Sequence, residues 1–129
     1  MKDFRELIAW QKSMQLVKEI YTLTELLPKE EIFGLASQLR RAAVSIPSNI
    51  AEGFGRHSYK EYIHFLYIAR GSKYEVETQI EIGIMQGFFS REQTAQAFEL
   101  SDVTGRLLNA LIAKLQHSSE KNSDDLPDA

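Results

Sequence analysis

The chain has no cysteine, and only three prolines and seven glycines in 129 residues. The missing cysteine excludes disulfide scaffolds, cysteine nucleophiles and cysteine-ligated zinc sites. Long apolar runs are also missing, because no segment approaches the ~18 apolar residues of a membrane span and charges interrupt the N-terminus. We therefore expect one cytoplasmic domain without membrane contact, large enough to bury a core without covalent links.

Charge is unevenly distributed along the chain. The formal net charge of the chain is -3, and residues 118–129 alone carry all of it. Residues 1–117 are therefore neutral overall. Between Arg40 and Lys73 the basic residues outnumber the acidic ones, whereas the acidic surplus lies between Tyr74 and Asp102. We expect a four-helix domain over 1–117, followed by an acidic, disordered tail over 118–129. A domain polarised in this way could steer a polyanion to one end.

Apolar residues recur at helical spacing in four segments separated by short breaks. The predicted helices run from Phe4 to about Leu26, from about Lys29 to Gly53, from Ser58 to about Gly87, and from Ser90 to about 117. The third and fourth helices each begin with a capping box, SYKE and SREQ. No alternating strand pattern occurs, so the sequence predicts an all-α, antiparallel up-and-down four-helix bundle.

The apolar rhythm of the second helix continues through Pro47. A proline inside a helix costs roughly 3 kcal/mol, because it removes a backbone donor and clashes with the carbonyl four residues back. Since Ala43, Ile46 and Ile50 hold phase across Pro47, we predict one kinked helix.

A polar ladder lies beside that apolar stripe. A solvent-facing ladder would offer arginine to phosphates, whereas a buried one would be a hydrogen-bonded network that fixes register. We favour the structural interpretation, with the second and third helices paired so that Arg40 and Arg41 lie opposite Gly71, Ser72 and Glu75. The ladder and its acidic partner are Gln38, Arg41, Ser45, Asn49, Glu52 and Glu75.

Two helices carry more apolar surface than one bundle needs. On the first helix we assign the stripe from Leu7 to Tyr21 to the core, which leaves a second stripe beginning at Leu16. The third helix also has two apolar sides. The surplus predicts a homo-oligomer interface, although irregular packing or the tail could cover it instead. The predicted interface residues are Leu16, Ile20, Leu23, Leu27, Tyr67, Tyr74, Ile82 and Met85.

Catalytic motifs are missing from the sequence. Glu61 and His64 form one Glu-x-x-His motif, but a di-iron bundle needs a second copy, and the other histidines are His57 and His117. No GxSxG elbow or glycine-rich phosphate loop occurs. We expect a protein that is not an enzyme and that uses no metal or cofactor.

The stretches EIFGLASQLRRAAVSIPSNIAEG and EYIHFLYIARGSKYEVETQ closely resemble the four-helix-bundle proteins encoded within intervening sequences of bacterial 23S rRNA genes. The resemblance spans Phe4 to Leu115, with a departure at Lys73 to Thr78, where a more apolar segment is expected. It implies a protomer that assembles as a ring, commonly a homopentamer, without catalysis of its own. The accessory proteins of diversity-generating retroelements, which work with a reverse transcriptase and its RNA, are also similar.

Two functional hypotheses follow. The leading one is a ring-forming bundle that binds structured RNA electrostatically, with oligomerisation multiplying a weak basic patch. The alternative is a protein-interaction scaffold or accessory subunit without direct nucleic-acid binding, in which the arginines pair internally and the acidic surface meets a basic partner protein. The residues predicted to contact RNA are Arg40, Arg41, Arg56, Lys60, Arg70 and Lys73.

Overall fold

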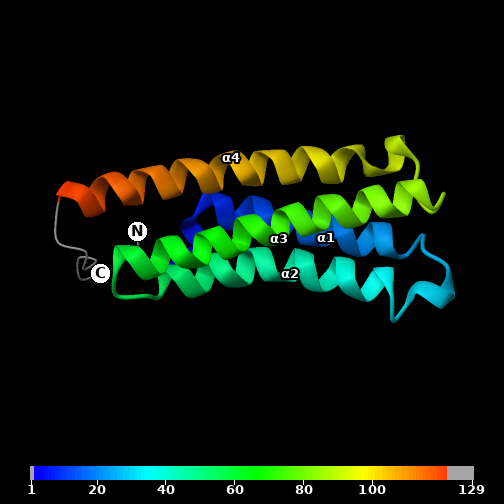
Figure 1. The fold of residues 1–129 in the computed structure, drawn as a ribbon, viewed down its shortest axis with the longest axis horizontal. Helices are drawn as coiled ribbons and strands as arrows, with labels where there is room; N and C mark the ends of the chain where they lie inside the picture. The colour runs from blue at the N-terminus through cyan, green and yellow to red at the C-terminus, as the bar shows by residue number, and fades with distance from the viewer. Residues whose placement is uncertain (1, 122–129) are drawn as a thin grey trace.

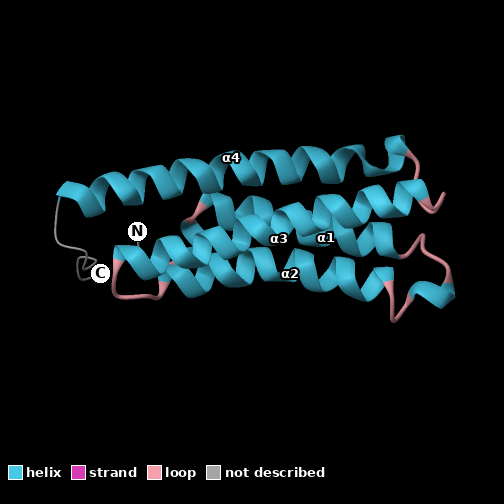
Figure 2. Cartoon of the chain, in the orientation of Figure 1, coloured by secondary structure: helices cyan, strands magenta, loops and turns pink. Residues whose placement is uncertain are grey.

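The computed structural model describes residues 2–121 and consists of four long helices with short connections. The helices are α1 (Ile8–Thr24), α2 (Leu35–Phe54), α3 (Tyr59–Met85) and α4 (Arg91–Lys121), with the 3-10 helices η1 (Phe4–Glu6) and η2 (Lys29–Glu31) preceding α1 and α2. Figure 2 shows helices joined by loops, and no strand occurs within residues 2–121. The prediction of an all-α protein is confirmed.

The four helices alternate in direction along the long axis of the molecule (Figure 1). Each helix packs against two others, because α1 contacts α2 and α4, and α3 also contacts α2 and α4. The side chains without solvent exposure include Leu16, Ile46, Leu66 and Leu108, one from each helix. Burial of one such aliphatic side chain contributes roughly 1.5–3 kcal/mol, so this central seam stabilises the bundle.

The predicted caps account for the starts of α3 and α4. The Ser58 hydroxyl accepts a hydrogen bond from the backbone N–H of Glu61 at 3.1 Å. Ser90 and Gln93 bond reciprocally, with backbone N–H to side-chain oxygen distances of 3.1 and 2.9 Å. Between these helices Gly87 has a φ of 79°, a left-handed conformation that glycine adopts without strain. Both predicted caps are therefore confirmed, and the full reciprocal box is formed at Ser90.

Three predicted helix boundaries differ from the structure. The first helix, predicted from Phe4, begins at Ile8, because Phe4–Glu6 forms only η1 and Leu7 is extended. The segment after Pro28 forms only η2, and α2 begins at Leu35, where the Glu31 side chain accepts from the first backbone N–H at 3.1 Å. At the other end, α4 continues to Lys121, so residues 118–121 of the predicted tail are helical. Residues 122–129 lie outside the described residues. The prediction that a single helix continues through Pro47 is confirmed, and the kink at that proline stays a prediction.

The burial of α1 differs from the sequence-based prediction, although Leu7 is buried and Trp10 and Val17 pack against the core as predicted. Leu16, Ile20 and Leu23, predicted to form an oligomer interface, are 0–2% exposed inside the protomer, and Leu27 is half-buried against the same core. Met14 and Tyr21, assigned to the core, are instead more than 40% exposed. Periodicity identifies two stripes but does not show which one faces the centre of the bundle. The stripe made only of aliphatic residues faces it, because such side chains pack more closely against the other helices.

The register between α2 and α3 also differs from the prediction. The Ser45 and Ser72 hydroxyls lie 2.8 Å apart, so α3 is shifted by about one helical turn relative to the predicted alignment. Gly53 explains the shift, because a Cβ there would lie 3.0 Å from atoms of Tyr62 and Phe65. This close approach of α3 to the end of α2 fixes the register.

Candidate functional site

An exposed apolar stripe runs along the outer side of α3. Tyr67, Tyr74, Ile82 and Met85, which we call the α3 stripe, are between 39% and 75% exposed. These four residues were predicted to remain uncovered after one protomer has closed, and their exposure agrees with that prediction. A continuous band of aromatic and aliphatic side chains on a helix marks an interaction surface. The participation of the stripe in an oligomer stays a prediction.

A second apolar surface lies between α1 and α2. Trp10, Met14 and Val17 of α1 face Val44 and Pro47 of α2 across a shallow hollow of about 330 Å³, which we call the α1–α2 groove. Its lining is almost entirely apolar. The sequence-based analysis missed this groove, because it placed these α1 residues in the core. The presence of Trp10 and Met14 in this stripe could have indicated an interaction surface, since aromatic and sulfur-containing side chains are common at interfaces.

The polar ladder of α2 lies at the seam with α3 and is largely structural. Asn49 donates from its side-chain amide to the backbone oxygen and the hydroxyl of Ser45, at 2.8 and 2.9 Å. Gln79 of α3 donates to Gln38 at 3.4 Å. Through Ser45 and Gln38 the ladder ties α2 to α3, as favoured above. Arg41 is exposed and outside it, and Glu52 is exposed and pairs with Arg56 instead.

The predicted pairing of Glu75 with an arginine is not found. Glu75 is exposed on α3, and within residues 2–121 neither it nor Arg41 has a hydrogen bond or ion pair. The shifted register explains this, because Glu75 lies on the outer side of the helix and not opposite Arg41.

Two of the predicted RNA-binding residues contact α4 instead of presenting a basic surface. Lys73 is only 8% exposed, and its ammonium lies 2.7 Å from the Glu77 carboxylate. Burial therefore removes Lys73 from any contact with RNA. Arg70 is half-buried, donates to the side chain of Asn109 at 3.1 Å and lies over the ring of Tyr67.

The remaining basic residues lie at two separate places along the bundle. Arg40 and Arg41 are in the first half of α2, whereas Arg56 and Lys60 flank the turn into α3. About 15 residues of helix separate the two pairs, which corresponds to roughly 22 Å. The six predicted residues thus do not form one patch.

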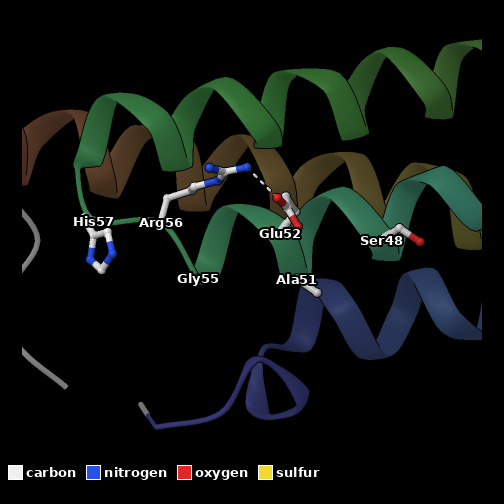
Figure 3. A pocket seen from close by; sticks show the side chains of 6 residues that line it. All are labelled: Ser48, Ala51, Glu52, Gly55, Arg56 and His57. Carbon is white, nitrogen blue, oxygen red and sulfur yellow. Dashed lines mark hydrogen bonds and ion pairs between the residues drawn. The ribbon is translucent and has the colours of Figure 1, made fainter.

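The Arg56 region is a shallow hollow at the end of α2. Figure 3 shows Arg56 directed toward Glu52, while His57 points away from that pair. The guanidinium lies 2.5 Å from the Glu52 carboxylate and stacks over the Phe65 ring at 4.6 Å. Ser48, Ala51 and Gly55 complete the wall of this hollow. Arg56, in the turn after α2, is therefore partly neutralised by a carboxylate of the last turn of that helix.

A polar cluster between α3 and α4 was not predicted. Ser101 of α4, which is fully buried, donates to Glu77 at 2.5 Å, and the same carboxylate holds Lys73. Gly105 makes room for this lysine, because a Cβ there would lie 2.5 Å from the Lys73 side chain. Lys73 and Glu77 share a helical face four residues apart, which was the available signal.

The lowered carboxyl pKa values belong to ion pairs on the surface. Hydrogen bonding to Arg91 lowers the pKa of Glu81, and hydrogen bonding to Arg106 lowers the pKa of Asp102. Among residues 2–121, no group of three or more metal-ligating side chains comes together. None of the helices in this range has the length and apolarity needed to cross a membrane.

The fold and these surfaces define an antiparallel four-helix bundle with apolar side chains on two outer faces. The model of the 23S rRNA-intervening sequence protein family matches residues 5–110, so the chain belongs to this family. It is also similar to a crystal structure from Bacteroides thetaiotaomicron, a protein with unknown function from the S23 ribosomal protein family. The two chains are 27% identical, with a TM-score of 0.75, and the match covers 81% of this chain and 98% of the other. A comparison with curated proteins gives no match.

Proposed function

We propose that the protein is a non-catalytic bundle that assembles with copies of itself and uses the assembly to bind structured RNA. The observation that carries the proposal is the presence of two apolar surfaces on different helices, the α3 stripe and the α1–α2 groove. Because α1 and α3 are not in contact within the bundle, the two surfaces belong to different sides of the protomer.

Two different surfaces favour a head-to-tail contact. In such a contact, the stripe of one copy packs against the groove of the next, and repetition of the same rotation closes a ring. The stripe supplies large projecting side chains, while the groove is concave and apolar, so the two are complementary in shape and chemistry. The ring that we propose has the five copies implied by the resemblance to intervening-sequence proteins.

The RNA part of the proposal relies on basic groups that stay accessible. Lys60 is exposed at the start of α3, and Arg56 beside it has five N–H donors, of which Glu52 engages only some. One protomer supplies few phosphate contacts, but several linked copies raise avidity without any new chemistry. Membership of the 23S rRNA-intervening sequence protein family is consistent with an RNA partner.

The assembly can be tested by disrupting each surface separately. A stripe variant, Tyr74→Glu with Met85→Glu, and a groove variant, Val44→Glu, should each reduce the mass measured by light scattering to that of a monomer. Mixing them should give one-to-one dimers, because one intact stripe then meets one intact groove. Ile8→Glu with Leu26→Glu is the matched control, since both residues are at least 50% exposed and neither lines the groove. An unchanged mass in both variants would refute the contact.

RNA binding can be tested by charge reversal and by salt. Arg56→Glu with Lys60→Glu should weaken binding of a structured RNA at least tenfold and reduce the slope of log K against log salt by about two. The control, Lys18→Glu with Lys114→Glu, changes net charge equally at other exposed positions. An affinity that does not respond to salt, or that falls equally in the control, would contradict the proposal. Complete absence of RNA binding would favour the protein-interaction scaffold.

A further inference from the structure

We propose that a hollow between the end of α1 and the start of α2 binds an unpaired nucleotide, with its base stacked on an aromatic ring and its phosphate held by two arginines. The hollow measures about 420 Å³ and is lined by Tyr21, Phe33, Ser37, Arg40 and Arg41. This inference rests on the proposed RNA binding, but it names a different place and a different form of RNA.

The aromatic side of the hollow is unusually exposed. Phe33, in the loop before α2, is 97% exposed, and Tyr21 on α1 is 41% exposed. A phenylalanine ring presented entirely to water contributes nothing to the core of the protomer. Aromatic rings exposed beside cations are typical of single-strand binding, because every base has a π-face that can stack on them.

The basic side combines one arginine held by the protein with one exposed arginine. Arg40 donates from Nε to the Thr24 hydroxyl at 2.9 Å, and its guanidinium lies 4.8 Å from the centre of the Tyr21 ring. These two contacts hold the guanidinium in place and leave its terminal N–H groups for a ligand. Arg41 is exposed and has no ion pair within the described residues, so it can follow a phosphate.

The acidic residue closest in sequence to the hollow is already occupied. Glu31 accepts a hydrogen bond from the backbone N–H of Leu35, and this contact places its carboxylate at the N-terminus of α2. Here the hollow differs from the one at Arg56, where the Glu52 carboxylate pairs with the cation and no phenylalanine or tyrosine lines the wall. The two sites should therefore prefer different forms of RNA.

The experiment compares three residues at position 33 on two probes. A fluorescein-labelled oligouridylate provides unpaired bases, and an RNA hairpin whose fully paired stem is closed by a non-nucleotide linker provides a duplex without unpaired bases. Phe33→Leu keeps an apolar side chain but removes the ring, and should weaken oligouridylate binding about tenfold while hairpin binding is unchanged. Phe33→Trp should restore or exceed the original affinity. Ile8→Leu, at another exposed apolar position, is the matched control and should have no effect.

A direct readout comes from a tryptophan placed in the hollow. The chain has one tryptophan, Trp10, so Trp10→Phe combined with Phe33→Trp leaves a single fluorophore at position 33. Stacking of a base should quench its fluorescence on addition of oligouridylate, and the added variant Arg41→Gln should shift the quenching curve to higher concentrations.

Three results would overturn the inference. Equal oligouridylate binding by the leucine and tryptophan variants would show that no base stacks at position 33. In that case, hairpin binding that still depends on Arg56 and Lys60 would leave the proposed function standing. A change in mass without a change in affinity would assign Phe33 to a contact between copies. If neither RNA binds the unmodified protein, the inference fails together with the RNA part of the proposed function.

Discussion

The glycines of α3 differ in what an added side chain would meet. A Cβ at Gly83 would lie 2.5 Å from the ring of Phe89, which is buried, whereas a Cβ at Gly71 would meet nothing within 4 Å. Both residues are helical, Gly71 in the middle of α3 and Gly83 in its last turn, so replacing either by alanine gains helix propensity. The difference in stability effect between a side chain added at Gly83 and one added at Gly71 therefore reports on packing at the α3–α4 connection.

We predict opposite effects of alanine at these two positions. Gly83→Ala should lower the free energy of unfolding by about 1–3 kcal/mol, because the Phe89 ring must move. Gly71→Ala should raise it by roughly 0.5–1 kcal/mol, the usual gain for replacing glycine in a helix. Urea unfolding measures both values, and equal effects of the two substitutions would contradict the close contact with Phe89.

Tyr62 makes stability depend on alkaline pH. It is 6% exposed, and burial raises the pKa of its hydroxyl from 10.0 to about 12. Since the folded pKa is above the unfolded one, this contribution is complete below pH 10 and is lost as the pH rises from 10 toward 12. The loss should reach about 3 kcal/mol. In Tyr62→Phe this loss should be missing, and parallel pH profiles of the two proteins would contradict the assignment.

At the scale of the helix, the sequence was sufficient to place most of the elements. The caps at Ser58 and Ser90 are local signals, since the cap hydroxyl and the backbone N–H that donates to it are three residues apart, and both caps are formed. The start of α2 was harder to predict from the sequence. Glu30 and Glu31 favour a helix start electrostatically, but they form only a 3-10 turn. The sequence could not show which side of α1 faces the core, since two apolar stripes on this helix have the same helical spacing.

Pairing between helices was the least predictable feature. The alignment of α2 with α3 depends on how closely Tyr62 and Phe65 approach Gly53, a contact that no local pattern reveals. The misplaced register then led to the wrong partner for Glu75 and to the placement of Lys73 on the surface. The resemblance did flag the segment from Lys73 to Thr78 as unusually polar for the family, and this segment carries the buried cluster with α4.

That cluster allows a prediction about the α3–α4 contact. Glu77→Leu leaves Lys73 buried beside Ser101 without its carboxylate, and should lower the free energy of unfolding by about 3 kcal/mol. Adding Lys73→Met should recover most of the loss, because the uncompensated charge is then removed. Chemical denaturation of the single and double variants provides the measurement.

An exposed ion pair on α4 is the control for this cycle. Asp102→Ala breaks a surface pair with Arg106 and should change stability little, because solvent screens such pairs. If the double variant at positions 73 and 77 were as unstable as the sum of its single variants, the two side chains would not act as a pair.

At the scale of the whole molecule, the bundle leaves two apolar surfaces and two separate basic sites exposed. The sequence predicted an excess of apolar surface and named half of it correctly, since the α3 stripe is exposed while Leu16, Ile20 and Leu23 are buried. It could not locate the α1–α2 groove, which exists only once two helices have been aligned. The sequence identified the six basic residues as one group. Only the fold shows that they lie at separate places along α2 and α3.

Assembly is the claim on which the multivalent binding of RNA depends. Light scattering of the purified, unmodified protein at micromolar concentration tests it most directly. Our account predicts a single species of about five times the 14.8 kDa mass of one chain, unchanged on moderate dilution. A well-behaved species of 14.8 kDa would contradict it, because the stripe and the groove would then both face water.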